Sequence, residues 1–172
     1  MSHIIRLFAF TLCLLIAALP LQPAHAQSLG DRRDRIRAAI ETSNLASAIT
    51  ELRSLHNVES SVFALNNYDY LLGHLPEQSG DLAGASSNYQ SVIARKSVLS
   101  QYALWHLAQI ARSTGDLVLE RGCLRQLITS APTSLLRDAA TLRLARSFFE
   151  SGDYAAVVST LRRTTSKTII HQ

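Results

Sequence analysis

The sequence predicts an all-α protein built from stacked helical hairpins, and two observations support this. A Gly-Asp pair occurs three times, at Gly80-Asp81, Gly115-Asp116 and Gly152-Asp153, at intervals of 35 and 37 residues. Small and apolar residues recur around each pair at the spacing of one helix face. A near-constant period of this length is typical of an α-solenoid, in which each hairpin packs on its neighbours. We expect about four hairpins.

The first element is a short apolar segment that predicts export. Arg6 precedes an apolar run over Leu7–Leu19, and Ala24-His25-Ala26 follows. A basic head, a short apolar core and an A-x-A exit define a secretory signal peptide. We therefore expect cleavage of residues 1–26, a periplasmic or secreted domain over residues 27–172, and no stable membrane span after cleavage. An uncleaved anchor is the alternative, but a span needs about 20 apolar residues and this run is shorter.

Two weaker hairpins follow. The first should pair a helix near Asp31–Glu41 with a second helix after a turn at Ser43-Asn44. The second hairpin turns at Gly80-Asp81, and Pro76 should kink or end its first helix near Leu75, because proline removes a helical hydrogen bond. The second helices carry apolar or small residues at Ala48, Leu52 and Leu55, and at Leu82, Ala85, Tyr89 and Val92.

The last two hairpins have the clearest pattern. In each, the glycine tolerates the left-handed conformation that ends a helix, and the aspartate can cap the next helix. Pro132 should end the second helix of the third hairpin. The repeated face consists of Leu104, Leu107, Ala108 and Ala111 with Leu117, Leu124, Leu127 and Ile128, and then Thr141, Leu144, Ala145 and Phe148 with Tyr154, Val157, Leu161 and Thr164.

These positions resemble the tetratricopeptide repeat (TPR) over residues 66–163. The likeness rests on Leu72-Gly73, Gly80-Asp81, Ala85 and Tyr89, on Leu107-Ala108, Gly115-Asp116, Leu124 and Pro132, and on Leu144-Ala145, Phe148 and Gly152-Asp153-Tyr154. It implies a right-handed superhelix whose first helices line a concave groove. Glu120 and Val157 depart from the pattern, because they replace the small residue seen as Ala85. Other α-solenoids therefore stay open.

A second likeness is narrower. Residues 68–73, Gly80-Asp81 and residues 100–108 resemble the superhelical region that precedes the catalytic domain of soluble lytic murein transglycosylases. The resemblance implies a non-catalytic part of a peptidoglycan enzyme. The catalytic acid of that family is a Glu followed by Ser, with a Gly-Leu-Met-Gln segment downstream. Glu59-Ser60 and Glu150-Ser151 match the dipeptide, but neither is followed by that segment.

No other motif predicts catalysis, a metal or a cofactor. The histidines His56, His74, His106 and His171 lack metal-ligand spacing, and there is no glycine-rich phosphate loop. Cys123 has no sequence context that implies an activated nucleophile. We expect it to be a small helix residue; an intermolecular disulfide is the alternative. We therefore expect that the chain is not an enzyme and needs no cofactor.

Charge limits the choice of partner. The formal net charge is +4, and the arginines are scattered rather than grouped in a dense run. Nucleic acid is a poor fit for such a chain if it is exported. Association with an anionic envelope polymer, including peptidoglycan, stays open.

The predicted groove carries the candidate binding residues. Because aromatic residues and arginine anchor protein interfaces, we expect a protein or peptide partner in the cell envelope to bind there. Packing between hairpins is the alternative for the aromatics, and ordinary solvated surface is the alternative for the polar residues. The candidates are Tyr70, His74, Tyr102, Trp105, Gln109, Arg112 and Arg146.

The leading functional hypothesis is thus an exported helical-repeat scaffold. The alternatives are the non-catalytic N-terminal part of a lytic transglycosylase that lacks its catalytic domain, and a module that stacks on copies of itself. After Leu161 the chain is rich in β-branched and hydroxyl residues, which make a poor capping helix. We expect an array truncated at its C-terminal end, with Ile169 and Ile170 partly exposed.

Overall fold

The computed structural model describes residues 24–168, with side chains for residues 29–162. This part of the chain contains nine α-helices and no strand, so the predicted all-α class is confirmed. The helices are α2 (Ala24–Glu41), α3 (Leu45–Val58), α4 (Ser60–Leu65), α5 (Tyr68–Ser79), α6 (Leu82–Ala94), α7 (Ser100–Ser113), α8 (Leu117–Ser130), α9 (Arg137–Glu150) and α10 (Tyr154–Thr168).

Two predictions concern residues outside the described part. Residues 1–23, most of the predicted signal peptide, lie outside it, as do Ile169 and Ile170, which were expected to be partly exposed. The predicted cleavage point after Ala26 falls in the first turn of α2. Across residues 24–168, none of the helices has the length and apolar character needed to cross a membrane.

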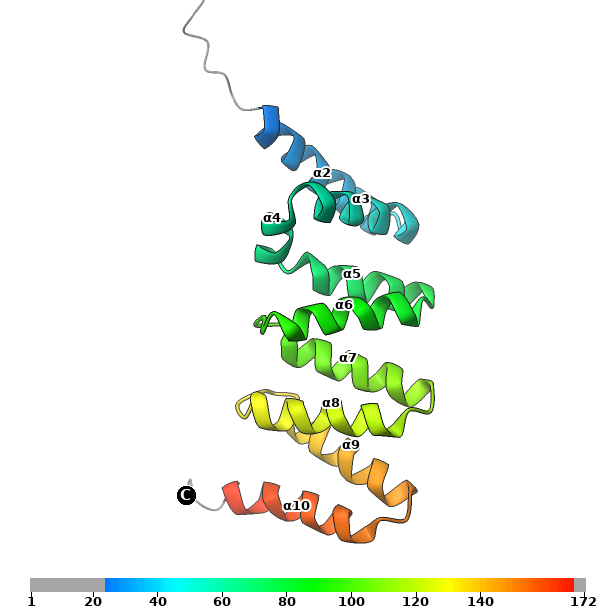
Figure 1. Ribbon diagram of the computed structural model, residues 1–172, viewed down its shortest axis with the longest axis vertical. Helices are drawn as coiled ribbons and strands as arrows, with labels where there is room; N and C mark the ends of the chain where they lie inside the picture. Colours follow the sequence, from blue (N-terminus) through cyan, green and yellow to red (C-terminus); the bar gives the residue numbers. More distant parts are fainter. Residues whose placement is uncertain (1–23, 169–172) are drawn as a thin grey trace, which may run out of the picture.

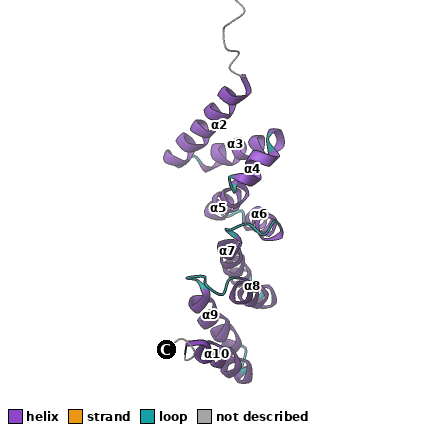
Figure 2. Cartoon of the chain, turned by 90° about the vertical axis from the view of Figure 1, so that its left-hand side faces the viewer, coloured by secondary structure: helices purple, strands orange, loops and turns teal. Residues whose placement is uncertain are grey.

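The helices pack in chain order as adjacent pairs (Figure 1). Helix α2 packs on α3, α5 on α6, α7 on α8 and α9 on α10. Contacts of α3 with α5, α6 with α7 and α8 with α9 join one pair to the next. In the side view, α5, α7 and α9 follow one side of the stack, whereas α6 and α8 follow the other (Figure 2). The first helices of successive pairs therefore share a face.

The turns have the chemistry that the Gly-Asp pairs predict. After α5, α7 and α9 the chain enters the left-handed region at Gly80, Gly115 and Gly152, with φ of 86°, 79° and 76°. Glycine has no Cβ to oppose this conformation. Each following aspartate caps the next helix: Asp81 accepts from Gly84 N, Asp116 from Leu119 N and Asp153 from Ala156 N. The predicted turn at Ser43-Asn44 is also present, and the Asn44 side chain caps α3.

Two features of the N-terminal half differ from the predictions. Helix α5 continues through Pro76 to Ser79, so of the predicted kink or end near Leu75 the end is wrong. The proline costs the helix only one backbone donor, close to its C-terminus, where the Gly80 and Asp81 amides donate to the Glu77 and Pro76 carbonyls. The short helix α4 was not expected.

The buried core runs along the stack, and each of its clusters joins helices of more than one pair. A first cluster, around Leu52 and Phe63, joins α2, α3, α4 and α5. A second, around Tyr89, joins α6 and α7, and a third, around Leu124, joins α7, α8 and α9. Gly73 of α5 allows α6 to approach closely, since a Cβ there would lie 2.8 Å from the Tyr89 ring. Neighbouring pairs therefore stabilise one another.

Candidate functional site

The candidate residues lie on α5, α7 and α9, the helices that follow one side of the stack (Figure 2). Polar side chains around them form two groups. The histidine cluster consists of Tyr70, His74 and Glu77 of α5, Tyr89 of α6 and His106 of α7. The arginine cluster consists of Arg112 of α7, Glu120 and Arg121 of α8, and Arg143, Arg146, Ser147 and Glu150 of α9.

Glu77 is the centre of the histidine cluster. Its Oε2 accepts a hydrogen bond from the Tyr89 hydroxyl at 2.6 Å. The same oxygen lies 2.8 Å from His106 Nδ1 and 3.8 Å from His74 Nδ1. His74 and Glu77 share a helix face because they are three residues apart, whereas His106 comes from α7. The cluster therefore links the first helices of two successive pairs.

Aromatic rings pack tightly around this carboxylate. The His106 ring stacks on Tyr89 with centroids 5.2 Å apart, and Tyr70 lies 5.7 Å from Tyr89. Burial, together with Glu77, raises the pKa of Tyr89, so its phenol keeps its proton and acts as a donor. Burial also lowers the pKa of His106, with Glu77 opposing that shift. Tyr70 is partly buried and thus contacts rings of both α6 and α7.

Two buried imidazole nitrogens in the cluster lack an aligned hydrogen bond: His74 Nδ1 and His106 Nδ1. The short contact of His106 Nδ1 with Glu77 Oε2 meets the distance for an ion pair but not the alignment of an N–H···O bond. Ligand atoms of His74, Glu77 and His106 all lie within 4.8 Å of one another. Among the described residues, these three form a set that could hold a metal ion.

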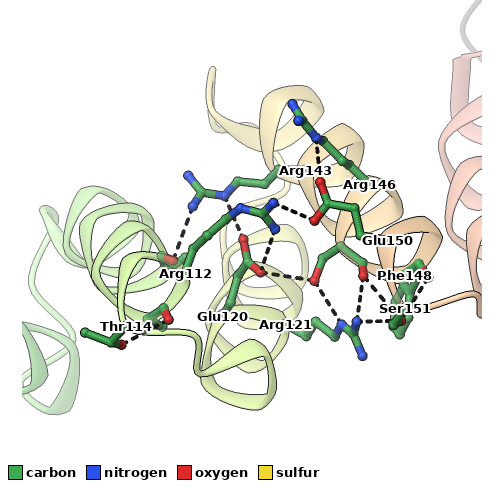
Figure 3. Close-up of polar contacts among 12 residues, drawn as sticks. Arg112, Thr114, Glu120, Arg121, Arg143, Arg146, Phe148, Glu150 and Ser151 are labelled. Carbon is green, nitrogen blue, oxygen red and sulfur yellow. Dashed lines mark hydrogen bonds and ion pairs between the residues drawn. The ribbon is translucent and has the colours of Figure 1, made fainter.

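The arginine cluster is centred on two glutamates (Figure 3). Glu120 is fully buried; its Oε1 accepts from Arg143 Nε at 3.0 Å, and its Oε2 accepts from Ser147 Oγ at 3.0 Å and lies 3.5 Å from Arg112. Glu150 accepts from Arg146 Nε at 2.9 Å and also pairs with Arg112. Arg112 therefore bridges the two carboxylates.

Ser147 extends the network to α8. Arg121 Nε donates to Ser147 Oγ at 3.0 Å, and that hydroxyl donates in turn to Glu120. Arg121 also lies over the Phe148 ring, 4.6 Å from its centroid. A buried carboxylate is costly unless it is paired and hydrogen-bonded, and Glu120 has three partners from two other helices. The network thus fixes the positions of α7, α8 and α9 relative to one another.

The arginine cluster leaves positive charge at the surface. It contains four arginines and two glutamates, so its formal charge is +4 − 2 = +2. Arg112, Arg143 and Arg146 line an open pocket of ≈ 480 Å³ together with Leu142. Leu142 and Phe149, both on α9, are 65% and 60% exposed. Chemically, this surface suits an anionic group next to an apolar one.

A larger cavity of ≈ 670 Å³ lies at another place, between the loops that precede α7 and α9. Tyr102, one of the predicted groove residues, lines this cavity and is 39% exposed. Lys96 is the one charged residue in its lining, so it offers little acid–base or metal chemistry. We therefore place the candidate site on the α7–α9 face rather than in this cavity.

The remaining predicted residues divide between the two clusters and the core. His74 belongs to the histidine cluster, and Arg112 and Arg146 belong to the arginine cluster. Trp105 is partly buried and packs against the core of α7, α8 and α9, with Arg143 over its ring at 5.4 Å. Gln109 is partly buried on α7 and belongs to neither cluster.

The sequence did not reveal the side chains that complete each cluster. It singled out Glu120 as a departure from the repeat, but not Arg143 and Ser147 as its partners. It showed no ligand spacing among the histidines, because His106 approaches His74 and Glu77 only after the helices stack. The one local signal was the i, i+3 spacing of His74 and Glu77, which places both on one helix face.

A comparison of this chain with protein-family models and with curated proteins found no match.

Proposed function

We propose that this protein is a non-catalytic helical-repeat scaffold of the cell envelope that binds an acidic segment of a protein or peptide across α7 and α9. The observation that carries the proposal is the positively charged pocket of Arg112, Arg143 and Arg146 beside the exposed side chains Leu142 and Phe149. An acidic side chain would occupy the pocket, and an apolar neighbour would contact α9.

The repeat hypothesis is supported by the equivalence of the helical pairs. Each of the last three pairs has the same left-handed glycine and the same aspartate cap, and α5, α7 and α9 occupy the same side of the stack (Figure 2). We interpret the chain as a TPR-like α-solenoid of about four hairpins with a right-handed superhelix. Its placement in the periplasm or outside the cell rests on the signal-peptide pattern of residues 1–26.

The composition of the surface favours a protein partner. Interfaces are enriched in arginine and aromatic residues, and large exposed apolar residues that gather in a patch mark interaction sites. Phe149 lies 5.6 Å from Tyr154, which is itself 62% exposed, so the patch continues onto α10. The Arg146 side chain is 76% exposed, which leaves guanidinium donors accessible to a carboxylate.

The environment of Glu150 argues against this residue as the general acid for hydrolysis of glycosidic bonds. A general acid in such an enzyme needs a raised pKa so that it holds a proton at neutral pH. Hydrogen bonds from Arg112 and Arg146 lower the pKa of Glu150 instead. Glu150 is therefore suited to organising arginines rather than to donating a proton.

Site-specific photo-crosslinking in cells tests the proposal. A photoreactive residue at Leu142 or Phe149 should give a defined adduct with an envelope protein, and Arg146→Glu should abolish that adduct by reversing the charge. The same residue at Val118, which is 83% exposed on α8, serves as the control for position. The exposed Arg53 of α3, changed to Glu, serves as the control for charge. Equal labelling from Val118, or no effect of Arg146→Glu, would refute the proposed surface.

A further inference from the structure

We propose that His74, Glu77 and His106 form a binding site for one divalent transition-metal ion of the Zn²⁺ type, which ties α5 to α7. This inference does not depend on the proposed binding of a protein partner, because the histidine cluster and the arginine cluster share no residue. It rests on the convergence of three ligand side chains from two helices and on two buried nitrogens that lack aligned hydrogen bonds.

The distances suit a metal ion after small side-chain movements. Tetrahedral Zn²⁺ holds nitrogen and oxygen ligands at about 2.0–2.2 Å, which places the ligand atoms roughly 3.3 Å from one another. The separations of Glu77 Oε2 from His106 Nδ1 and from His74 Nδ1 are 2.8 and 3.8 Å, on either side of that value. All three ligand atoms lie within 4.8 Å of one another, so side-chain movements on the order of 1 Å would bring them to the separations of a zinc site.

The ligand types and their burial favour Zn²⁺ among common cations. Imidazole nitrogen and carboxylate oxygen together suit zinc and its neighbours, whereas magnesium and calcium prefer oxygen alone. Three protein ligands leave one coordination position for water. The His106 and Glu77 side chains are 21% and 18% exposed, and the His74 side chain is 39% exposed, so water reaches the site from the His74 side.

Neighbouring groups would hold the ligands in place. The Tyr89 hydroxyl donates to Glu77 Oε2 at 2.6 Å and fixes the carboxylate. Gln78 Nε2 lies 3.0 Å from His74 Nε2, and rotation of this amide would present its oxygen to an Nε2–H once Nδ1 binds the metal. Such partners orient metal-bound histidines and carboxylates in known sites. The fully buried Tyr89 ring also packs against His106, which limits the movement of that imidazole.

A metal ion here would account for two buried nitrogens that the fold leaves without aligned hydrogen bonds. It would give the unaligned Nδ1 atoms of His74 and His106 a partner, and it would join the first helices of two successive pairs. Buried polar atoms without partners are uncommon, and each asks for an explanation such as a bound ion. The alternative is a metal-free contact in which Glu77 alone holds His106 and Tyr89.

Binding of Zn²⁺ and Co²⁺ to the full chain, prepared without a histidine tag, distinguishes these cases. Titration calorimetry with Zn²⁺ should find one ion per chain, and Co²⁺ should give the visible absorption of a four-coordinate site. His74→Gln, Glu77→Gln and His106→Gln should each weaken Zn²⁺ binding by at least about tenfold. The control is His56→Gln, because His56 lies on α3 against Phe63, outside the cluster.

Two further measurements keep the result interpretable. Circular dichroism of each variant checks that loss of binding is not loss of folding, and Tyr89→Phe should weaken binding about 10–100-fold while it leaves all three ligands in place. The melting temperature of the wild-type chain should rise on addition of Zn²⁺, and that of the three ligand variants should not. Unchanged Zn²⁺ binding in folded Glu77→Gln and His106→Gln, or loss of binding in His56→Gln, would overturn the proposal. Absence of stoichiometric binding to the wild-type chain would do the same.

Discussion

At the scale of single residues, Glu120 decides how α7, α8 and α9 are held together. It occupies the position at which the preceding pair has Ala85, and both side chains are fully buried. A carboxylate at such a place is tolerated only with good partners, since removing one of them leaves an uncompensated buried charge. Arg143, Arg112 and Ser147 supply those partners. We therefore expect this carboxylate to contribute to the specificity of α9 packing.

Arg143→Met should destabilise the protein by about 3 kcal/mol, because it leaves the buried Glu120 without its shortest ion pair. Replacing Glu120 by Met in the same chain should recover at least about 1 kcal/mol, because the unpaired charge is then gone. Urea unfolding of the wild type, both single variants and the double variant measures this coupling. Strict additivity of the two single effects would contradict the assigned pair.

Cys123 should be unreactive in the folded protein. The side chain is buried, and burial raises the pKa of its thiol to about 11, so the reactive thiolate is scarce at pH 8. In a Cys13→Ser chain, where Cys123 is the one remaining thiol, a thiol reagent should react slowly in buffer and rapidly in denaturant. Fast reaction in buffer would support the alternative of an accessible cysteine that forms an intermolecular disulfide.

Glu150 should make stability depend on pH in the acid range. Hydrogen bonds from Arg112 and Arg146 lower its pKa in the folded state below the unfolded value of about 4.3. A lowered carboxyl pKa stabilises the folded state above the unfolded pKa, and this contribution is lost as pH falls through the folded pKa. The melting temperature of the wild type should exceed that of Glu150→Gln at pH 7, and the difference should begin to shrink near the unfolded pKa of about 4.3 and vanish only below the lowered folded pKa. A difference that is the same at pH 7 and pH 3 would show that the charge of Glu150 is not involved.

At the scale of helices, the turns and caps could be predicted from neighbouring residues, whereas effects that depend on tertiary packing could not. The Gly-Asp turns follow from the conformation of Gly80 and the capping by Asp81, both of which depend on a few neighbouring residues. The continuation of α5 through Pro76 was missed, because the lost hydrogen bond is offset by burial of Pro76 and by the Gly80 cap. Helix α4 was missed because its six residues carry too little periodicity to be seen.

The close approach of α5 and α6 gives a paired prediction for two glycines. Gly73→Ala should destabilise the protein by roughly 1–2 kcal/mol, because the new Cβ would lie 2.8 Å from the fully buried Tyr89 ring and overpack the core. The steric cost of the new Cβ outweighs the gain of about 1 kcal/mol in helix propensity that replacing a glycine gives. Gly122→Ala, on the exposed face of α8 with no atom within 4 Å, should show that gain alone. Chemical unfolding compares the two, and an equal stabilisation by both would contradict the contact with Tyr89.

At the scale of the whole molecule, the face that carries the candidate residues arises from stacking rather than from any one helix. The pairs of helices could be predicted, because periodicity and turns are read along the chain. The two clusters could not, because Glu77 meets His106 and Glu120 meets Arg143 only when successive pairs are packed with a defined offset. Sequence spacing therefore identified His74, Arg112 and Arg146 as candidates on this face, but not the side chains that complete their environments.

The stacking also predicts which helices unfold locally first. Helices α7 and α8 have packed neighbours on both sides, and their core is shared with α9, so they should exchange amide hydrogens most slowly, whereas α2 and α10 should open first.

Leu124→Ala removes a fully buried side chain from the cluster that joins α7, α8 and α9, at a cost of about 2–5 kcal/mol. Hydrogen exchange followed by mass spectrometry should then show a larger loss of protection in α7, α8 and α9 than in α2 and α3, since the effect passes between nearest neighbours. Leu52→Ala, in the cluster of α2, α3, α4 and α5, is the matched variant and should give the reverse distribution. An equal loss of protection in all helices for both variants would mean that the stack unfolds as one cooperative unit, and that coupling along it is stronger than nearest-neighbour packing provides.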